Sequence, residues 1–156
     1  MVTLLDDMLK QAKALTEDEP DVIANLANIS ALIYEQMPRL NWVGFYLTRE
    51  PEMLVLGPFQ GRVACVRIPF GQGVCGTAAA TQKLQRVADV NQFAGHIACD
   101  SASNSEVVAP IVVNGKTVAV LDVDSPELDR FSEQDAQGLA AIAEYCQQLN
   151  WAGQGA

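Results

Sequence analysis

Cysteine chemistry is the first possibility that this sequence raises. Its four cysteines are Cys65, Cys75, Cys99 and Cys146. Cys99 lies three residues after His96, the single histidine, within the stretch 91–105, which has neither helical nor strand periodicity. A long irregular stretch in a small domain often carries function, and a thiol placed there can act as a nucleophile. The alternative interpretation is a loop thiol without a role.

Cys75 is a second candidate nucleophile because glycines flank it just before a predicted helix. The run 71–76 contains three glycines and leads into a small-residue helix predicted at 77–83. The helix dipole and the free backbone N–H groups at such a start would stabilise a thiolate. Cys65 and Cys146 are instead expected to pack structurally, Cys65 in a strand at 63–68 and Cys146 on the apolar face of the last helix.

Two aspartates interrupt the pattern of a strand predicted at 116–125. Alternation places four side chains on one face of that strand: Val118, Val120, Asp122 and Asp124. Burying an unpaired carboxylate costs several kcal/mol. Either this end of the strand is exposed and both acids are solvated, or the two acids belong to a site.

A third acid, Glu106, begins the partner strand of the same hairpin. The Asn-Gly pair at 114–115 suits a two-residue turn, and pairing outward from that turn puts Glu106 opposite Val123, beside both aspartates. Three acids at one end of a hairpin would bind an ammonium group or a metal. They could also hold one carboxyl group protonated as a general acid.

Aromatic side chains precede the acids in the chain. Trp42 and Tyr46 share parity in the strand predicted at 41–47, where they either fill the core or form the wall of a small pocket. An aromatic wall next to acids suits a small cationic or zwitterionic ligand.

Metal and dinucleotide sites are not expected. A zinc site would have to combine His96 with three cysteines in a chain that has no C-x-x-C pair. The G-x-G-x-x-G pattern at 71–76 has no acid at the position about 20 residues further on, where a dinucleotide-binding fold places one. A tight turn into a helix is the better interpretation, and no cofactor is predicted.

Hydrophobic periodicity indicates which elements position these residues. Helices are predicted at 3–15, from 18 to Pro38, at 77–83 and after Ser132, which is expected to cap the last helix together with Asp135. Strands are predicted at 41–47, 53–60, 63–68, 84–90 and on both sides of the 114–115 turn. Because the hairpins are local, this order favours an α+β fold, an α/β/α sandwich with a largely antiparallel central sheet flanked by helices. We expect a single domain over 1–156.

Composition excludes several classes of partner. The chain has 156 residues, 49% of them hydrophobic, with 10 Lys and Arg against 19 Asp and Glu and a formal net charge of −9. Nucleic acid and anionic membranes are therefore poor partners. No apolar run approaches the roughly 20 residues of a membrane span. Sparse cysteines and an acidic N-terminal segment predict a cytoplasmic protein whose thiols rest reduced.

Four segments together resemble the free methionine-(R)-sulfoxide reductases, single-domain enzymes of the GAF fold. They read NWVGFYL, LGPFQGRVACVRIPFGQGVCGTAA, VADVNQFAGHIACDSASNSEVVAPIV and VAVLDVDS. The resemblance implies that Cys99 is the nucleophile, which overrules the dipole argument for Cys75. It implies that Cys65 is the principal resolving thiol and Cys75 a second one. The implied substrate pocket is lined by Trp42, Tyr46, Glu106, Asp122 and Asp124.

The resemblance also implies a reaction. Free methionine (R)-sulfoxide would be reduced to methionine through a sulfenic acid and an intramolecular disulfide, which thioredoxin would reduce, in an enzyme that forms a homodimer. The alternative is a GAF-type module that binds a small molecule or senses redox state without catalysis.

Overall fold

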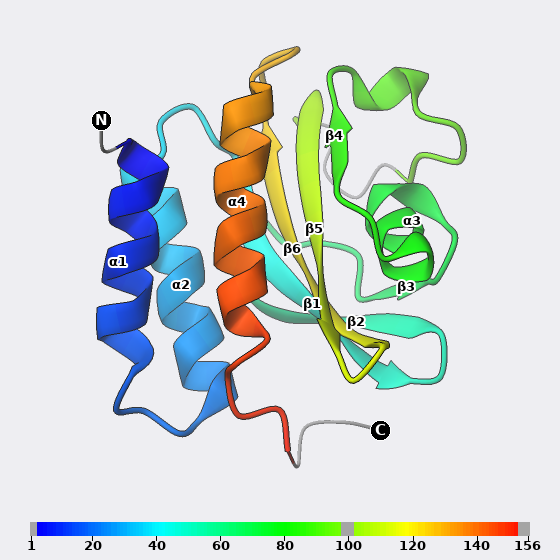
Figure 1. Cartoon of the computed structure of the whole chain (residues 1–156). Coiled ribbons are helices and arrows are strands. Elements are labelled where there is room, and N and C mark those ends of the chain that lie inside the picture. The colour runs from blue at the N-terminus through cyan, green and yellow to red at the C-terminus, as the bar shows by residue number, and fades with distance from the viewer. Residues whose placement is uncertain (1–2, 98–101, 153–156) are drawn as a thin grey trace.

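A computed structural model of the chain describes residues 3–97 and 102–152, in which helices cover both faces of a sheet (Figure 1). The helices are α1 (Leu4–Thr16), α2 (Val22–Gln36), α3 (Gly73–Thr81) and α4 (Glu133–Cys146), with a short 3-10 helix at Val90–Gln92. The strands are β1 (Trp42–Glu50), β2 (Met53–Gly61), β3 (Arg67–Pro69), β4 (Gln85–Val87), β5 (Ser105–Val113) and β6 (Lys116–Ser125).

The strands of the described residues form one sheet in the order β3-β2-β1-β6-β5-β4, and every neighbouring pair is antiparallel. On one face α2 packs on β1 and β2, α4 packs on β5, and α1 lies against both helices. On the other face α3 contacts β3, β4, β5 and β6 (Figure 1). The predicted α+β class, with an antiparallel sheet between helices, is confirmed.

Local sequence signals account for the ends of two elements. Asn114 and Gly115 have φ values of 53° and 78°, the left-handed pair that a tight β5–β6 turn requires. At the start of α4 the side chain of Ser132 accepts a hydrogen bond from the backbone of Asp135, and the Asp135 side chain accepts one from the backbone of Ser132. Both predicted features are confirmed.

The register of the β5–β6 hairpin differs from the prediction. Ile111 pairs with Ala119 whereas Val112 pairs with Thr117, so Val118 is an extra residue that forms a β-bulge. The predicted placement of Val118 on the same face as the two aspartates was wrong, because this residue packs against the core beneath the helices. Beyond the bulge the pairing is displaced by one residue along the whole site end of the hairpin.

The two faces of the sheet bury different sets of side chains. The α1, α2 and α4 side holds the larger apolar core, to which β6 contributes Leu121 and Val123. The α3 side holds a smaller cluster that includes Trp42, Tyr46 and Cys75. Among the described residues, no helix is both long and apolar enough to cross a membrane.

Candidate active site

A pocket lies on the α3 side of the sheet, where α3, β1, β5 and β6 meet. Residues of all four elements line it, including six that the sequence had singled out: Trp42, Tyr46, Cys75, Glu106, Asp122 and Asp124. Ala64, from the loop before β3, and His96 also line it. The fold therefore brings together residues that are up to 82 positions apart, from Trp42 to Asp124.

The three acids of the pocket are buried. Glu106, Asp122 and Asp124 are 8%, 5% and 7% exposed, so the alternative of solvated carboxylates at a strand end was wrong. Glu106 lies directly opposite Asp124 and not opposite Val123, because the bulge at Val118 displaces the pairing by one residue. That displacement puts the Glu106 side chain on the same face as the aspartates.

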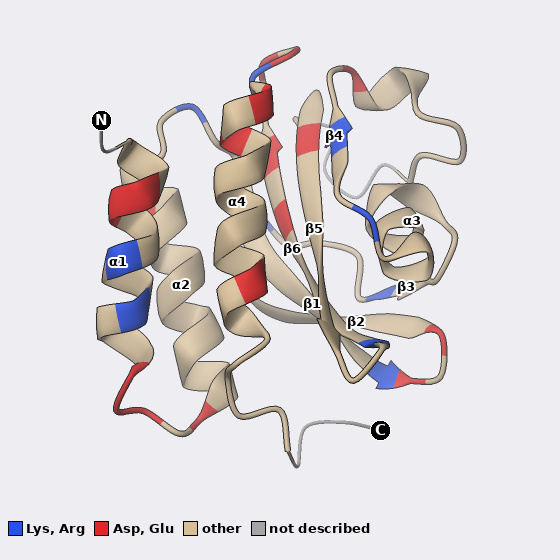
Figure 2. Ribbon diagram, in the orientation of Figure 1, with Lys and Arg blue, Asp and Glu red and all other residues tan. Residues whose placement is uncertain are grey.

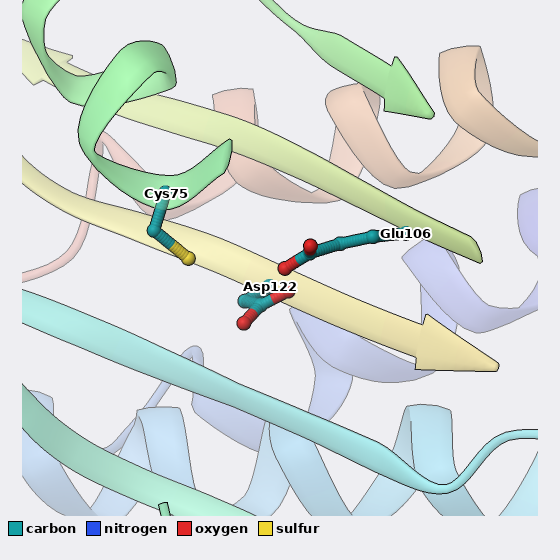
Figure 3. A group of neighbouring side chains, drawn as sticks. All are labelled: Cys75, Glu106 and Asp122. Carbon is teal, nitrogen blue, oxygen red and sulfur yellow. The ribbon is translucent and has the colours of Figure 1, made fainter. Parts of the chain in front are cut away.

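Cys75 lies close to two of these acids. Figure 3 shows Cys75 pointing from α3 toward Glu106 on β5 and Asp122 on β6. One donor atom of each residue lies within 4.8 Å of the other two. Asp122 Oδ1 is buried and has no hydrogen-bond partner among the described residues. One thiol and two carboxyl groups could ligate a thiophilic divalent cation, but they equally form the floor of a pocket for a cationic or proton-accepting ligand.

Crowding of the acids changes the protonation of Glu106. Burial and then the charges of Asp122 and Asp124 raise the pKa of the Glu106 carboxyl well above its usual value. A carboxyl group that keeps its proton near neutral pH can donate that proton to a leaving oxygen. The cluster can thus combine one proton donor with carboxylates that accept an ammonium group.

The environment of Cys75 contradicts the dipole argument. Cys75 lies in the first turn of α3, because the helix begins at Gly73 and not at residue 77 as predicted. Burial and then the charges of Asp122, Glu106 and Asp124 raise the pKa of its thiol well above the usual value. Desolvation and nearby negative charge both oppose thiolate formation and outweigh the favourable helix start. In this protonation state Cys75 is a poor nucleophile.

Two stacked rings, those of Trp42 and Tyr46, form the wall of the pocket. The Trp42 ring stacks on Tyr46 at a centroid distance of 5.8 Å and on Phe59 of β2 at 5.2 Å. Phe59, which was not predicted as a site residue, does not line the pocket but packs on the Trp42 ring from its position opposite Gly44 in the β1–β2 pairing. A Cβ atom on Gly44 would overlap both Phe59 and the Trp42 ring, so glycine at this position lets the rings lie flat on the sheet.

The same rings hold the loop that carries Cys65. Trp42 Nε1 donates a hydrogen bond of 3.1 Å to the carbonyl oxygen of Arg62, and the Tyr46 hydroxyl donates one of 3.1 Å to the carbonyl oxygen of Cys65. Burial raises the pKa of Tyr46, as do the neighbouring acids, so the hydroxyl stays a donor. The pocket wall thereby fixes the backbone of the neighbouring loop.

The structure describes the surroundings of three of the four cysteines. Cys65 lies in the loop before β3 and not in a strand, because β3 begins at Arg67, and it is disulfide-bonded. Cys75 and Cys146 are free and buried, and burial raises the pKa of Cys146 to about 12. Cys99, the predicted nucleophile, falls in 98–101, outside the described residues.

Comparison with known proteins agrees with this arrangement. A model of the GAF domain family matches residues 23–149. The chain is 54% identical to the free methionine-R-sulfoxide reductase of Escherichia coli over 136 residues, which cover 87% of this chain and 82% of that protein. The chain belongs to the GAF-domain family of free methionine-R-sulfoxide reductases.

Two further relatives support the family assignment. Protein YtsP of Bacillus subtilis is 61% identical over 138 residues, which cover 88% of this chain and 85% of that protein. The free methionine-R-sulfoxide reductase of Neisseria meningitidis, solved in complex with its substrate, is 43% identical. It superimposes with a TM-score of 0.91 over 96% of this chain and 90% of that one. Members of the family are oxidoreductases, and the predicted enzyme class is confirmed.

Proposed function

We propose that this chain reduces free methionine (R)-sulfoxide to methionine, with Cys99 as nucleophile and Cys65 as resolving thiol. The observation that carries the proposal is the burial of Glu106, Asp122 and Asp124 in one pocket beside an aromatic wall. Acids that are buried together suit a ligand that brings its own positive charge. The relatives named free methionine-R-sulfoxide reductases have such a ligand, a free amino acid with an ammonium group, as the substrate that their name states.

The pocket accounts for a preference for the free amino acid. The ammonium group of the substrate compensates the desolvated carboxylates of Asp122 and Asp124. A methionine sulfoxide inside a peptide has an amide nitrogen instead, which brings no positive charge to compensate those carboxylates. Trp42 and Tyr46 pack around the methyl and sulfur end of the side chain.

The first chemical step transfers the sulfoxide oxygen to Cys99. The Cys99 thiolate bonds to the substrate sulfur while Glu106 or Asp124 delivers a proton to the sulfoxide oxygen. The protonated oxygen then passes to Cys99 Sγ as its bond to the substrate sulfur and the transient bond between the two sulfurs break. Methionine leaves, and Cys99 retains the oxygen as a sulfenic acid. The raised pKa of Glu106 supports this residue as the proton donor.

The second step removes the oxygen as water. The Cys65 thiol condenses with the Cys99 sulfenic acid, forming a disulfide and releasing one water molecule. A protein dithiol of the thioredoxin type then supplies two electrons and two protons to regenerate both thiols. The disulfide-bonded state of Cys65, next to the pocket residue Ala64, supports this role. The raised pKa of Cys75 makes it the slower, second resolving thiol. Turnover requires a reducing compartment such as the cytoplasm.

A stoichiometric reaction tests the proposal. Reduced protein is mixed with one equivalent of free methionine (R)-sulfoxide, and we expect one methionine to be released and two thiols lost per chain. Cys99→Ser should abolish release even in the first turnover, whereas Cys146→Ser, at a free thiol remote from the acids, should leave it intact. Unchanged thiols in the wild type would overturn the proposal, and oxidation by peroxide alone would favour a redox-sensing module.

A further inference from the structure

The loop before β3 exposes apolar side chains next to a disulfide. Val63 is 87% exposed and Val66 is 59% exposed, and they lie two residues before and one residue after Cys65, which is disulfide-bonded and half-buried. Single exposed apolar residues are ordinary on protein surfaces. Two of them flanking a redox-active sulfur form an apolar rim around the atom that an external thiol has to reach.

The backbone of this loop is held in place by hydrogen bonds to β1 and β2. The carbonyl of Arg62 accepts a hydrogen bond from Trp42, that of Cys65 accepts one from Tyr46, and that of Val66 accepts one of 2.9 Å from the backbone N–H of Leu56. The loop is therefore fastened to β1 and β2 along its length, with Val63 and Val66 directed outward. A preorganised surface binds a partner without the cost of ordering a loop.

Charge around the loop differs from the rest of the molecule. Residues 53–88 contain no Asp or Glu but four bases, Arg62, Arg67, Lys83 and Arg86, in a chain with a net charge of −9. Figure 2 shows red on α4, on the turn between α1 and α2 and on β5 and β6, whereas β3, β4 and the loop after α3 carry blue and no red, and α3 itself carries no charge. Arg62 is exposed beside Val63, and Arg67 pairs with Glu50 at 3.0 Å on the surface. The surface formed by 53–88, whose charged residues are all bases, therefore suits an acidic protein better than the acidic helix surfaces do.

We propose that Val63, Val66 and Arg62 form the docking surface for an acidic protein dithiol that reduces the disulfide of Cys65. The inference deepens the proposed function, because it names where on this chain the recycling partner binds. One thiolate of the partner attacks Cys65 Sγ, forms a mixed disulfide and releases the other sulfur of the protein disulfide as a thiol. The partner's second thiol then attacks its own sulfur in the mixed disulfide and releases the Cys65 thiol. Two electrons pass to this chain, and the partner leaves as a disulfide.

Two reductants separate docking from intrinsic reactivity. The oxidised protein is reduced either with dithiothreitol, which needs no surface, or with a reduced thioredoxin of negative net charge. Val63→Asp and Val66→Asp should each slow reduction by thioredoxin at least tenfold and change the rate with dithiothreitol less than twofold. Leu128→Asp, at an apolar side chain 61% exposed between β6 and α4, is the matched control and should change neither rate.

Several outcomes would overturn the docking surface. The first is an unchanged rate of disulfide reduction by thioredoxin in both valine variants, and the second is equal slowing of reduction by both reductants. The third is a valine variant that sediments with a lower mass than the wild type, which would show that the patch joins two copies of the chain. A thioredoxin lacking its second cysteine should become trapped on Cys65 in peptide maps, and trapping on the other sulfur contradicts the proposed attack. Disulfide reduction is measured without methionine sulfoxide, so this test does not depend on the proposed function. If the protein does not reduce methionine sulfoxide, the proposed function is wrong, but the docking surface can still be tested.

Salt dependence tests the electrostatic part. Arg62→Glu should slow disulfide reduction by thioredoxin at low ionic strength. The difference in this rate from the wild type should shrink several-fold as salt is added, because exposed charges are screened within about 10 Å at 0.1 M salt. The dithiothreitol rate should not follow this trend. A salt-independent effect of Arg62→Glu would remove Arg62 from the docking surface.

Discussion

The hydroxyl group of Tyr46 donates a hydrogen bond of 3.1 Å to the main-chain carbonyl oxygen of Cys65. One side chain thereby contacts two parts of the site, since its ring forms the wall of the pocket and its hydroxyl holds the loop that carries the disulfide. In the proposed reaction the wall serves the first step and the loop serves the second. Substitutions at Tyr46 can therefore separate the two steps.

Tyr46→Phe keeps the ring and removes the hydrogen bond. We expect the first release of methionine to change less than twofold, because the wall is retained, and disulfide formation to slow several-fold, because the carbonyl of Cys65 loses its donor. Rapid-quench measurement of methionine and of free thiols distinguishes the steps. Tyr34→Phe, at a partly exposed ring on α2, is the control. Equal slowing of both steps would show that the hydroxyl acts on the substrate instead.

Cys65→Ser should keep the first turnover and impair the next ones. Without the resolving thiol the Cys99 sulfenic acid persists, and dimedone labelling followed by mass spectrometry should detect it. Multiple turnover with thioredoxin should fall at least tenfold. If multiple turnover is unimpaired, Cys75 is the main resolving thiol, and Cys65→Ser combined with Cys75→Ser should then block recycling.

Glu106 should make stability depend on pH. Its folded pKa is raised above the reference value of 4.5, so its stabilising effect is complete below pH 4.5 and is lost as the pH rises through the folded pKa. Glu106→Gln removes this loss, and its free energy of unfolding should exceed that of the wild type by about 1–2 kcal/mol at pH 8. Urea unfolding of both proteins at pH 5 and pH 8 checks the sign. A wild type that is more stable than the variant at pH 8 would contradict it.

Asp124→Asn should reduce kcat/KM for the free sulfoxide by about tenfold or more, the typical loss when a hydrogen bond to a charged group is removed. The side chain is 7% exposed and lies opposite Glu106, so it faces the pocket and not solvent. Asp18→Asn, in the exposed turn after α1, removes the same charge at a distance from the pocket and should leave kcat/KM unchanged. Equal effects of the two substitutions would exclude a direct role for Asp124.

Gly44→Ala should damage both the fold and the pocket. Its Cβ would overlap Phe59 and the Trp42 ring, so the rings must move, at a cost of about 1–3 kcal/mol in unfolding free energy. KM should rise because Trp42 no longer lies flat against the substrate. Gly71→Ala, where a Cβ meets no atom within 4 Å but φ is 87°, should destabilise the chain and leave KM unchanged. Thermal unfolding and initial rates compare the two variants.

Local signals in the sequence predicted the frame of the site well. The Asn114-Gly115 turn, the Ser132–Asp135 cap and the shared parity of Trp42 and Tyr46 depend on short-range rules, and the structure has all three. The clustering of three acids at one end of the hairpin was also predicted, since hairpin pairing is local. What pattern alone could not decide was whether those acids are buried, because burial depends on α3 covering them.

The errors have equally physical causes. A bulge at Val118 changes the register by one residue, and no residue type in the strand marks it, so Glu106 was paired with Val123 instead of Asp124. The reactivity of the Cys75 thiol was predicted from its place at a helix start, whereas burial and the acids of β5 and β6 determine its pKa. The contact between Trp42 and Phe59 requires the β1–β2 register, which bulges also interrupt. The first error is a local irregularity that no residue type marks, and the other two concern contacts between elements that short-range patterns do not encode.

The bulge at Val118 also bears on how this hairpin can change in length during evolution. Residues of β5 and β6 alternate between the core beneath the helices and the pocket, so one residue gained or lost between the bulge and Ser125 would exchange the two sets. Asp122 and Asp124 would then point into the core, and Leu121 and Val123 would point into the pocket. Insertions at the Asn114-Gly115 tip leave both sets in place. Length variation among homologous chains should therefore be tolerated at the tip and selected against along 119–125.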